Sequence, residues 1–127
     1  MKKKIVHPDR AEGFATGAYS DGLIVDGYVY VSGQACVDFK SSKFMLGTIE
    51  EETKRTLNNI KAILSEAGAT MNDVIKCTVH LADINDFSVF NEIYSEFFEG
   101  IRPTRTTVQS VLAENIKIEI DCIAKLP

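Results

Sequence analysis

The segment Ile101–Val108 (IRPTRTTV) holds two arginines on either side of a proline. Arg105 follows Pro103 by two residues, and the fixed φ of proline stiffens the chain that leads to it. A guanidinium held in place can bind a carboxylate through two parallel hydrogen bonds. The alternative is a solvated loop arginine, which composition alone favours. Arg102, nearer the end of a predicted helix, is expected to face solvent or to complement the helix dipole.

Glu119 is the candidate for proton transfer. It alternates with aliphatic residues in IKIEIDCI, so its carboxylate projects from the less apolar face of a predicted strand. Enclosure by a partner subunit would suit this carboxylate to acid–base chemistry. The alternative is an ordinary cross-strand partner for Lys117, and the residues alone do not decide between the two.

Four further polar residues occupy positions where a ligand could be contacted. Tyr19 in GAYSDG and Ser32 in VSGQ lie beside glycines, which allow a ligand to approach the backbone closely. Asn91 falls on a predicted helix, where a surface amide is the alternative. For His80 a structural role is favoured, because the sequence pairs it with no nucleophile or orienting acid.

The cysteines and histidines argue against metal chemistry. Cys36, Cys77 and Cys122 are odd in number and never form a Cys-x-x-Cys pair, which predicts neither a disulfide framework nor a zinc ribbon. His7 and His80 are the only histidines, and neither has the spacing of a metal ligand. We therefore expect no metal, and a reducing, cytoplasmic compartment.

Length and charge narrow the class of protein. The 127 residues suit one domain spanning the whole chain, residues 1–127. A net charge of −4 disfavours the broad basic surface that binds nucleic acid. No apolar run has the length of a membrane span, and the basic first residues lack the apolar core of a secretory signal.

The elements that must position these residues can be predicted from periodicity. Asp26-Gly27 suits a tight turn between two β-branched and aromatic runs within residues 22–34, and residues 3–6 form a possible edge strand. Thr48 and Glu51 match a capping box that opens a helix ending near Gly68.

The second half alternates between strands and a helix. Residues 73–84 predict a strand with Ile75, Cys77, Val79 and Leu81 on one face, and Asn85 or Asp86 is expected to cap a helix that ends at Gly100. Residues 106–112 and 115–124 predict two more strands. This order predicts one α+β domain, a six-stranded mixed sheet with two helices packed on one face. The other face is expected to form a subunit interface that could enclose a site, and it carries Tyr28, Tyr30, Ser32, Thr78, His80, Lys117 and Glu119 in some combination.

In this order the fragments GAYSDG, VYVSGQ, LADINDFSVFNEIYSEFF, RPTRTTV and IKIEIDCIA resemble the RidA family, also called YjgF or L-PSP, over nearly the whole chain. The resemblance implies a chorismate-mutase-like fold assembled as a homotrimer with sites in clefts between subunits. It implies hydrolysis of reactive enamines and imines, such as 2-aminoacrylate and 2-iminopropanoate, to 2-keto acids and ammonia, without metal or organic cofactor.

The same resemblance implies roles for individual residues. Arg105 would bind the substrate carboxylate, and Glu119 would position or activate water. Tyr19, Ser32 and Asn91 would line the pocket. Thr107, also expected to contact the substrate, stands where many relatives have a cysteine. The chain also lacks the proline common before the last strand, and both departures leave the efficiency of the reaction open.

Two other functions are kept open. One is an RNA-cleaving translation inhibitor, an activity also attached to this family, although the acidic charge disfavours it. The other is a non-enzymatic trimer, chaperone-like or binding small carboxylates, that uses the same clefts.

Overall fold

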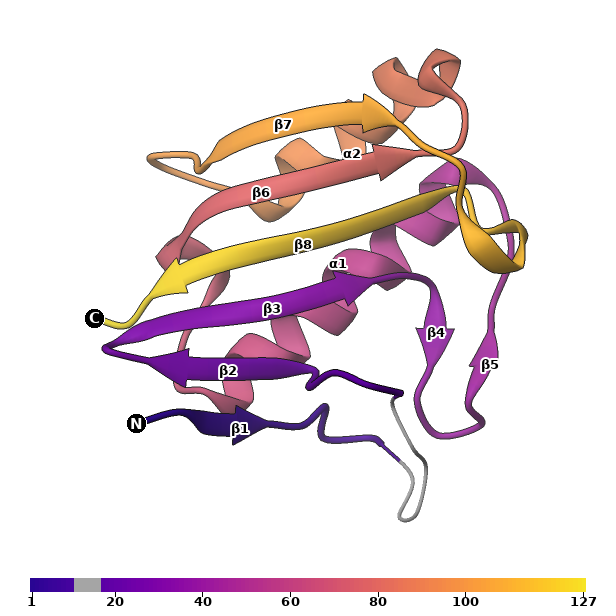
Figure 1. Ribbon diagram of the computed structural model, residues 1–127. Helices are drawn as coiled ribbons and strands as arrows, with labels where there is room; N and C mark the ends of the chain where they lie inside the picture. Colours follow the sequence, from indigo (N-terminus) through magenta and orange to yellow (C-terminus); the bar gives the residue numbers. More distant parts are fainter. Residues whose placement is uncertain (11–16) are drawn as a thin grey trace.

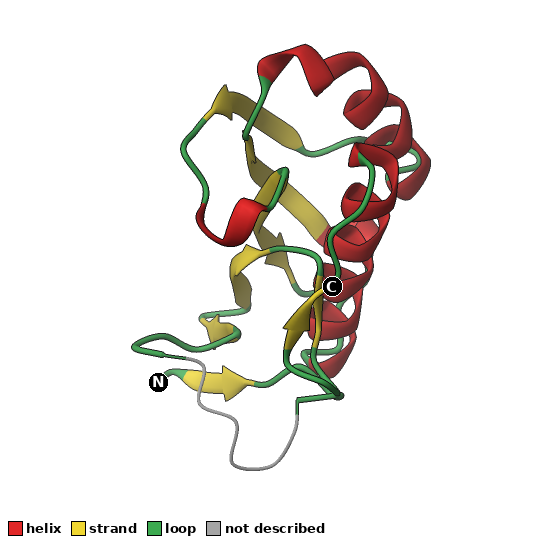
Figure 2. Cartoon of the chain, turned by 90° about the vertical axis from the view of Figure 1, so that its right-hand side faces the viewer, coloured by secondary structure: helices red, strands yellow, loops and turns green. Residues whose placement is uncertain are grey.

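The structure is a computed structural model that describes residues 1–10 and 17–127. In these residues, six strands form one mixed sheet in the order β1-β2-β3-β8-β6-β7, and the two α-helices pack behind it (Figure 1). Figure 2 shows both helices on one side of the sheet, so the other face is left open. The predicted α+β architecture is confirmed. The elements are β1 (Lys3–Ile5), β2 (Gly22–Val25), β3 (Tyr28–Gln34), β4 (Val37–Asp38), β5 (Lys43–Phe44), α1 (Ile49–Glu66), η1 (Met71–Asp73), β6 (Val74–Leu81), η2 (Ile84–Asp86), α2 (Phe87–Phe97), β7 (Thr104–Gln109), η3 (Ala113–Asn115) and β8 (Ile118–Lys125).

Helix α1 begins and ends where its capping residues predict. The Thr48 hydroxyl accepts the amide of Glu51, whose carboxylate accepts the amide of Thr48 in return. At the other end Gly68 has a φ of +84°, and the amide of Ala69 reaches back to the carbonyl of Leu64. The buried stripe of α1 packs on the sheet, where each large aliphatic side chain contributes about 1.5–3 kcal/mol. This stripe consists of Leu57, Ile60, Ile63 and Leu64.

The hairpin of β2 and β3 sets the two faces of the sheet. Asp26 and Gly27 have φ angles of 51° and 80°, as a type I′ turn requires. Val29 and Val31 are buried against the helices, whereas Tyr30 is exposed on the open face. This alternation is the one predicted.

Strand β7 differs from the prediction in its bounds. It spans Thr104–Gln109 and pairs in parallel with β6, so it begins two residues earlier than expected and excludes residues 110–112. The expected range was wrong because Val111, which continues the β-branched run, lies in the loop and is fully exposed. As a result Arg105 is a strand residue, paired with Cys77.

The face predicted for Ile75 was also wrong. The register of β6 and β8 shifts between Val74 and Lys76, and Ile75 is the extra residue at this bulge. Its side chain is 45% exposed, and Val74 takes the buried position instead. A single inserted residue moves a side chain to the opposite face, and periodicity gives no sign of it.

Lys117 does not lie on the open face, where it was predicted. Its backbone amide and its Nζ both bond to the carboxylate of Glu52, a fully buried residue of α1. Burial acts to raise the pKa of Glu52, but hydrogen bonds from Lys117, Gly47 and Cys36 outweigh it and lower that pKa. A buried carboxylate is stable only with such partners. Lys117 is therefore not the partner of Glu119.

Helix α2 begins by a different cap from the one expected. Neither Asn85 nor Asp86 makes a side-chain cap, because the carboxylate of Asp83 accepts the amide of Asn85 one turn earlier, at the start of η2. At the other end Arg102 donates from Nε to the carbonyl of Phe98, which fits the predicted interaction with the helix end. None of the described helices is both long and apolar enough to cross a membrane.

Candidate functional site

Arg105 is held by the face of α2 that packs beside β7. Its Nη1 donates to Oδ1 of Asn91 at 2.8 Å. Its guanidinium carbon lies 4.8 Å from the ring centre of Tyr94, 5.4 Å from that of Phe90 and 5.5 Å from that of Phe87. These four residues recur at the three- and four-residue spacing of one helix face. Contacts between a cation and aromatic faces contribute roughly 0.5–2 kcal/mol each, so the guanidinium is fixed before any ligand arrives.

Thr107 lies on the same face of β7 as Arg105. It pairs with Val79, a core residue, and its side chain is half-buried. Its Oγ1 is buried and has no hydrogen-bond partner among the residues that the structure describes. The contact of Thr107 with substrate stays a prediction, because this hydroxyl is buried within the single chain.

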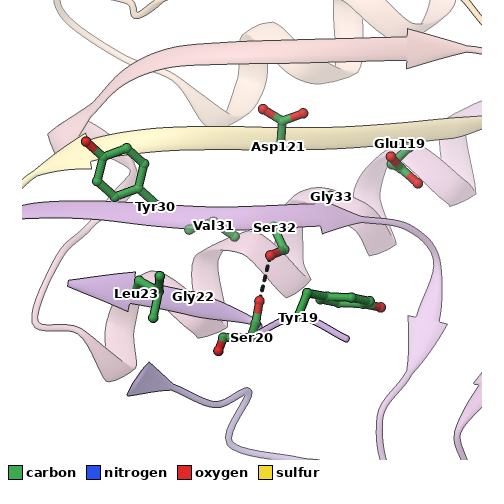
Figure 3. Close-up of a pocket in the computed structure, with 10 residues that line it drawn as sticks. All are labelled: Tyr19, Ser20, Gly22, Leu23, Tyr30, Val31, Ser32, Gly33, Glu119 and Asp121. Atoms are coloured by element: carbon green, nitrogen blue, oxygen red, sulfur yellow. Dashed lines mark hydrogen bonds between the residues drawn. The ribbon is translucent and has the colours of Figure 1, made fainter. Parts of the chain in front are cut away.

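Glu119 lies on the open face, in a groove of about 800 Å³. It stands on β8 directly opposite His80 of β6, and its carboxylate turns towards Gly33 of β3 (Figure 3). Tyr19 and Ser32 line the same groove, and the Ser32 hydroxyl donates to the carbonyl of Ser20 at 2.6 Å. The lining consists of Tyr19, Ser20, Gly22, Leu23, Tyr30, Val31, Ser32, Gly33, Glu119 and Asp121.

Gly33 is a site residue that sequence reasoning did not single out. A Cβ at this position would lie 2.7 Å from Oε2 and 2.9 Å from Cδ of Glu119. The strand pairing shifts between Val31 and Gln34, so Ser32 and Gly33 together face Asp121. Only glycine leaves room for the Glu119 carboxylate across this bulge. In the sequence, the glycine directly after Ser32 was the only sign that this position is special. It did not indicate that the side chain packed over it is that of Glu119.

A smaller cavity of about 200 Å³ adjoins the groove and shares Tyr19, Gly33 and Glu119 with it. Arg10 and Asp21 form part of its wall and are joined by two hydrogen bonds between their side chains. Glu119 therefore borders both cavities.

The predicted site residues fall into two separate groups within one chain. Tyr19, Ser32 and Glu119 share the groove on the open face. Asn91 and Arg105 border a different cavity, of about 310 Å³, beside α2. The pairing explains the separation, because the partner of Arg105 is the core residue Cys77, whereas the partner of Glu119, His80, has its side chain on the open face. One chain alone does not bring Arg105 and Glu119 together.

The described residues offer no site for metal or thiol chemistry. No group of three His, Cys, Asp or Glu side chains among them is placed to hold a metal ion. Cys36, Cys77 and Cys122 are free and buried. Burial raises the pKa of all three thiols, that of Cys36 to about 11, so none is an activated nucleophile.

Comparison with known proteins supports the sequence resemblance. A family model described as Endoribonuclease L-PSP matches residues 10–126. The 2-iminobutanoate/2-iminopropanoate deaminase of Rattus norvegicus is 42% identical over 96% of this chain and 89% of its own. A RutC family protein of Pyrococcus abyssi is 42% identical over 98% of each chain. The crystal structure of E. coli TdcF with bound serine superimposes with a TM-score of 0.87 at 36% identity, covering 98% of this chain and 100% of that one.

Proposed function

The chain belongs to the RidA (YjgF, L-PSP) family, and from this premise we propose that it hydrolyses reactive 2-imino and 2-enamino acids to 2-keto acids and ammonia. Substrates of the 2-aminoacrylate and 2-iminopropanoate type carry a carboxylate next to the imine carbon. The observation that carries the proposal is the prearranged Arg105 guanidinium, which presents its donors at the edge of the sheet while Asn91 and three rings hold it. Relatives at about 40% identity that are named as deaminases of such imines support it.

In the proposed reaction the two groups of residues act on opposite ends of the substrate. Arg105 binds the carboxylate through two hydrogen bonds. Glu119 accepts a proton from the water that attacks the imine carbon. Tyr19, Ser32 and Thr107 line the pocket, and Asn91 orients Arg105. Holding water beside an already labile imine supplies the orientation that contributes much of the acceleration.

Because Arg105 and Glu119 lie on opposite faces of one sheet, we place the reaction between copies of the chain, in a homotrimer. The open face also exposes apolar and aromatic side chains, as a subunit interface would require. These are Tyr28, Tyr30, Ile75 and Val108. E. coli TdcF, which binds serine, is a relative of this chain, and serine has the carboxylate and the size expected of a ligand here.

The direct test couples the purified protein to a serine or threonine dehydratase and follows the decay of the imine. We expect the imine to decay faster with the wild-type protein than without it, and Arg105→Ala to leave the rate of decay unchanged. An unaccelerated decay with wild type, or equal acceleration by Arg105→Ala, would refute the proposal. Ligand binding that depends on Arg105 without turnover would identify a carboxylate-binding protein instead.

A mixing experiment tests the placement between subunits. Arg105→Ala and Glu119→Gln are each expected to be inactive alone. If the two are unfolded together and reassembled in equal amounts, about one site in four receives an intact Arg105 and an intact Glu119 from two different chains. Recovery of about a quarter of wild-type activity is expected. No recovery from correctly reassembled trimers would place both residues in one chain.

RNA cleavage is the second candidate, because the matching family model is described as an endoribonuclease. The net charge of −4 and the two carboxylates of the groove oppose binding of a phosphate backbone. Nuclease activity that co-purifies through several columns and disappears in Glu119→Gln would establish this function. Activity that is lost on purification would exclude it.

A further inference from the structure

Asp121 is a second carboxylate in the groove that the proposed reaction has not used. It follows Glu119 by two residues on β8, so both side chains project from the open face (Figure 3). Its side chain is half-buried, and no hydrogen bond or ion pair within the described residues engages it. A carboxylate that a fold leaves unpaired beside a reactive group is available for chemistry.

The pKa of Asp121 lies above the ordinary value of an aspartate. Burial raises its pKa, and the positive charges of His80 and Lys76 on β6 oppose that rise without cancelling it. The other titratable groups facing it are Glu119 on its own strand and Tyr30 on β3. A carboxyl group that keeps its proton to higher pH than an exposed aspartate can act as a general acid.

The Ser32 hydroxyl, on the strand next to Asp121, is already engaged. The Ser32 Oγ donates its proton to the carbonyl of Ser20, so Ser32 cannot readily protonate a substrate. Asp121 faces the bulge formed by Ser32 and Gly33, where the strand pairing is interrupted. The same bulge leaves room for the Glu119 carboxylate over Gly33, and Glu119 and Asp121 line the same groove.

We propose that Asp121 is a second catalytic residue of the reaction, which protonates the imine nitrogen while Glu119 deprotonates the attacking water. This inference rests on the proposed function. In the first step the water oxygen bonds to the imine carbon, Glu119 takes one water proton, and Asp121 gives its proton to the nitrogen. The product is the carbinolamine, with Glu119 protonated and Asp121 ionised.

In the second step the carbon–nitrogen bond breaks. Glu119 gives its proton to the departing nitrogen, which leaves as ammonia, and Asp121 takes the proton of the carbinolamine hydroxyl as the keto group forms. Both carboxyl groups return to their starting states, so the cycle needs no other reactant than water. Enzymes commonly use two carboxyl groups in opposite protonation states, one as general acid and the other as general base.

The test compares Asp121→Asn with Asp26→Asn in the dehydratase-coupled assay. Asp26 lies exposed in the turn between β2 and β3, outside the groove, so its variant makes the same charge change away from the site. We expect kcat to fall about 100-fold in Asp121→Asn with KM changed less than about threefold, as general acid catalysis predicts. Any fall in wild-type kcat that comes from loss of the Asp121 proton as the pH rises should be absent from the variant. Asp26→Asn should match wild type in both respects.

An Asp121→Asn protein with wild-type kcat and an unchanged pH profile would overturn the inference while leaving the proposed function intact. Wild type that fails to accelerate imine decay would overturn both. If Asp121→Asn does not fold, Asp121→Ala assayed with added formate decides the question, because formic acid can occupy the vacated space and supply the proton. Rescue by formate supports the role, and its absence from folded Asp121→Ala refutes it.

Discussion

The two parts of the proposed site are built in different ways. The first, which we call the Arg105 half, consists of Arg105, Asn91 and the three rings of α2, and its geometry is set by packing within one chain. The second, the Glu119 half, consists of Glu119, Gly33, Asp121, Tyr19 and Ser32, and it borders an open groove. Tyr19 in this half is 58% exposed.

The difference assigns distinct tasks to the two halves. Binding a carboxylate needs a rigid pair of donors, and a guanidinium already fixed loses little freedom when ligand binds. Proton transfer needs exclusion of water, which an open groove in one chain does not provide. A second copy covering the groove would supply that exclusion. We therefore expect damage to the Glu119 half to reduce turnover, and damage to the Arg105 half to weaken binding.

Glu119→Gln should have the largest effect. The amide keeps the size of the side chain over Gly33 but cannot accept a proton from water. General acid–base catalysis contributes roughly 10²- to 10⁴-fold, so kcat should fall by that factor with little change in KM. Steady-state kinetics in the coupled assay measure both. A variant whose KM rises while kcat is kept would assign Glu119 to binding and break the comparison.

Arg105→Lys should act on the other half. Lysine keeps the positive charge but loses the planar fork, together with the parallel hydrogen bonds that the fork makes. Loss of one charge-assisted hydrogen bond corresponds to roughly 10- to 100-fold in KM, with a smaller change in kcat. Calorimetric titration with a 2-keto acid, the product, offers an independent measure of binding. Unchanged affinity would show that charge alone suffices and that the rings serve only the fold.

Gly33→Ala should disturb the Glu119 half without removing a functional group. The added Cβ would lie 2.7 Å from Oε2 of Glu119, so the carboxylate must move. Displacement by a fraction of an ångström is expected to lower kcat roughly tenfold, while affinity for the keto acid stays near wild type. Loss of affinity instead would show that the two halves are not separable in the way proposed.

The two halves also differ in how far the sequence could predict them. Arg105 stands two residues after Pro103, and the spacing of Phe87, Phe90 and Tyr94 marks a helix face, so each element was predictable. That the rings contact the guanidinium follows from Arg105 lying inside β7, whose start was placed two residues too late. Periodicity defines faces well within an element, but it does not define where an edge strand begins.

Around the Glu119 half, on the neighbouring parts of the sheet, irregular pairing limited the prediction. The bulge at Ile75 and the bulge at Ser32–Gly33 each insert one residue into a ladder, and alternation in a single strand contains no information on such an insertion. Lys117 was misplaced because its partner Glu52 is far away in sequence and buried, which composition would not suggest for a glutamate. Contacts between distant segments were the part that only the structure could supply.

The smallest predicted effect concerns His7, which contacts the wall of the smaller cavity that Glu119 also borders. The residue is 5% exposed, and its ring stacks on that of Phe39 with 3.9 Å between the ring centres. Its Nε2 lies 3.1 Å from Oδ1 of Asn59, and its Nδ1 accepts a hydrogen bond from the backbone amide of Asp9. Its backbone amide donates to Asp21, which also binds Arg10 at the smaller cavity. Since Nδ1 accepts a hydrogen bond, the folded state holds the ring neutral.

Burial lowers the pKa of His7 from 6.5, although Asn59, Asp9 and Asp21 act to raise it. The unfolded chain therefore binds a proton near pH 6.5 that the folded chain does not, and stability should fall as the pH drops below that value. Urea unfolding at pH 7.5 and at about 5.5 should show a lower midpoint at the acid pH in wild type and a smaller difference in His7→Gln. The carboxyl groups with lowered pKa, such as Glu51 and Glu52, start from 4.5 and act at lower pH. An equal difference in both proteins would show that acid acts elsewhere, and that His7 does not hold this side of the groove in place.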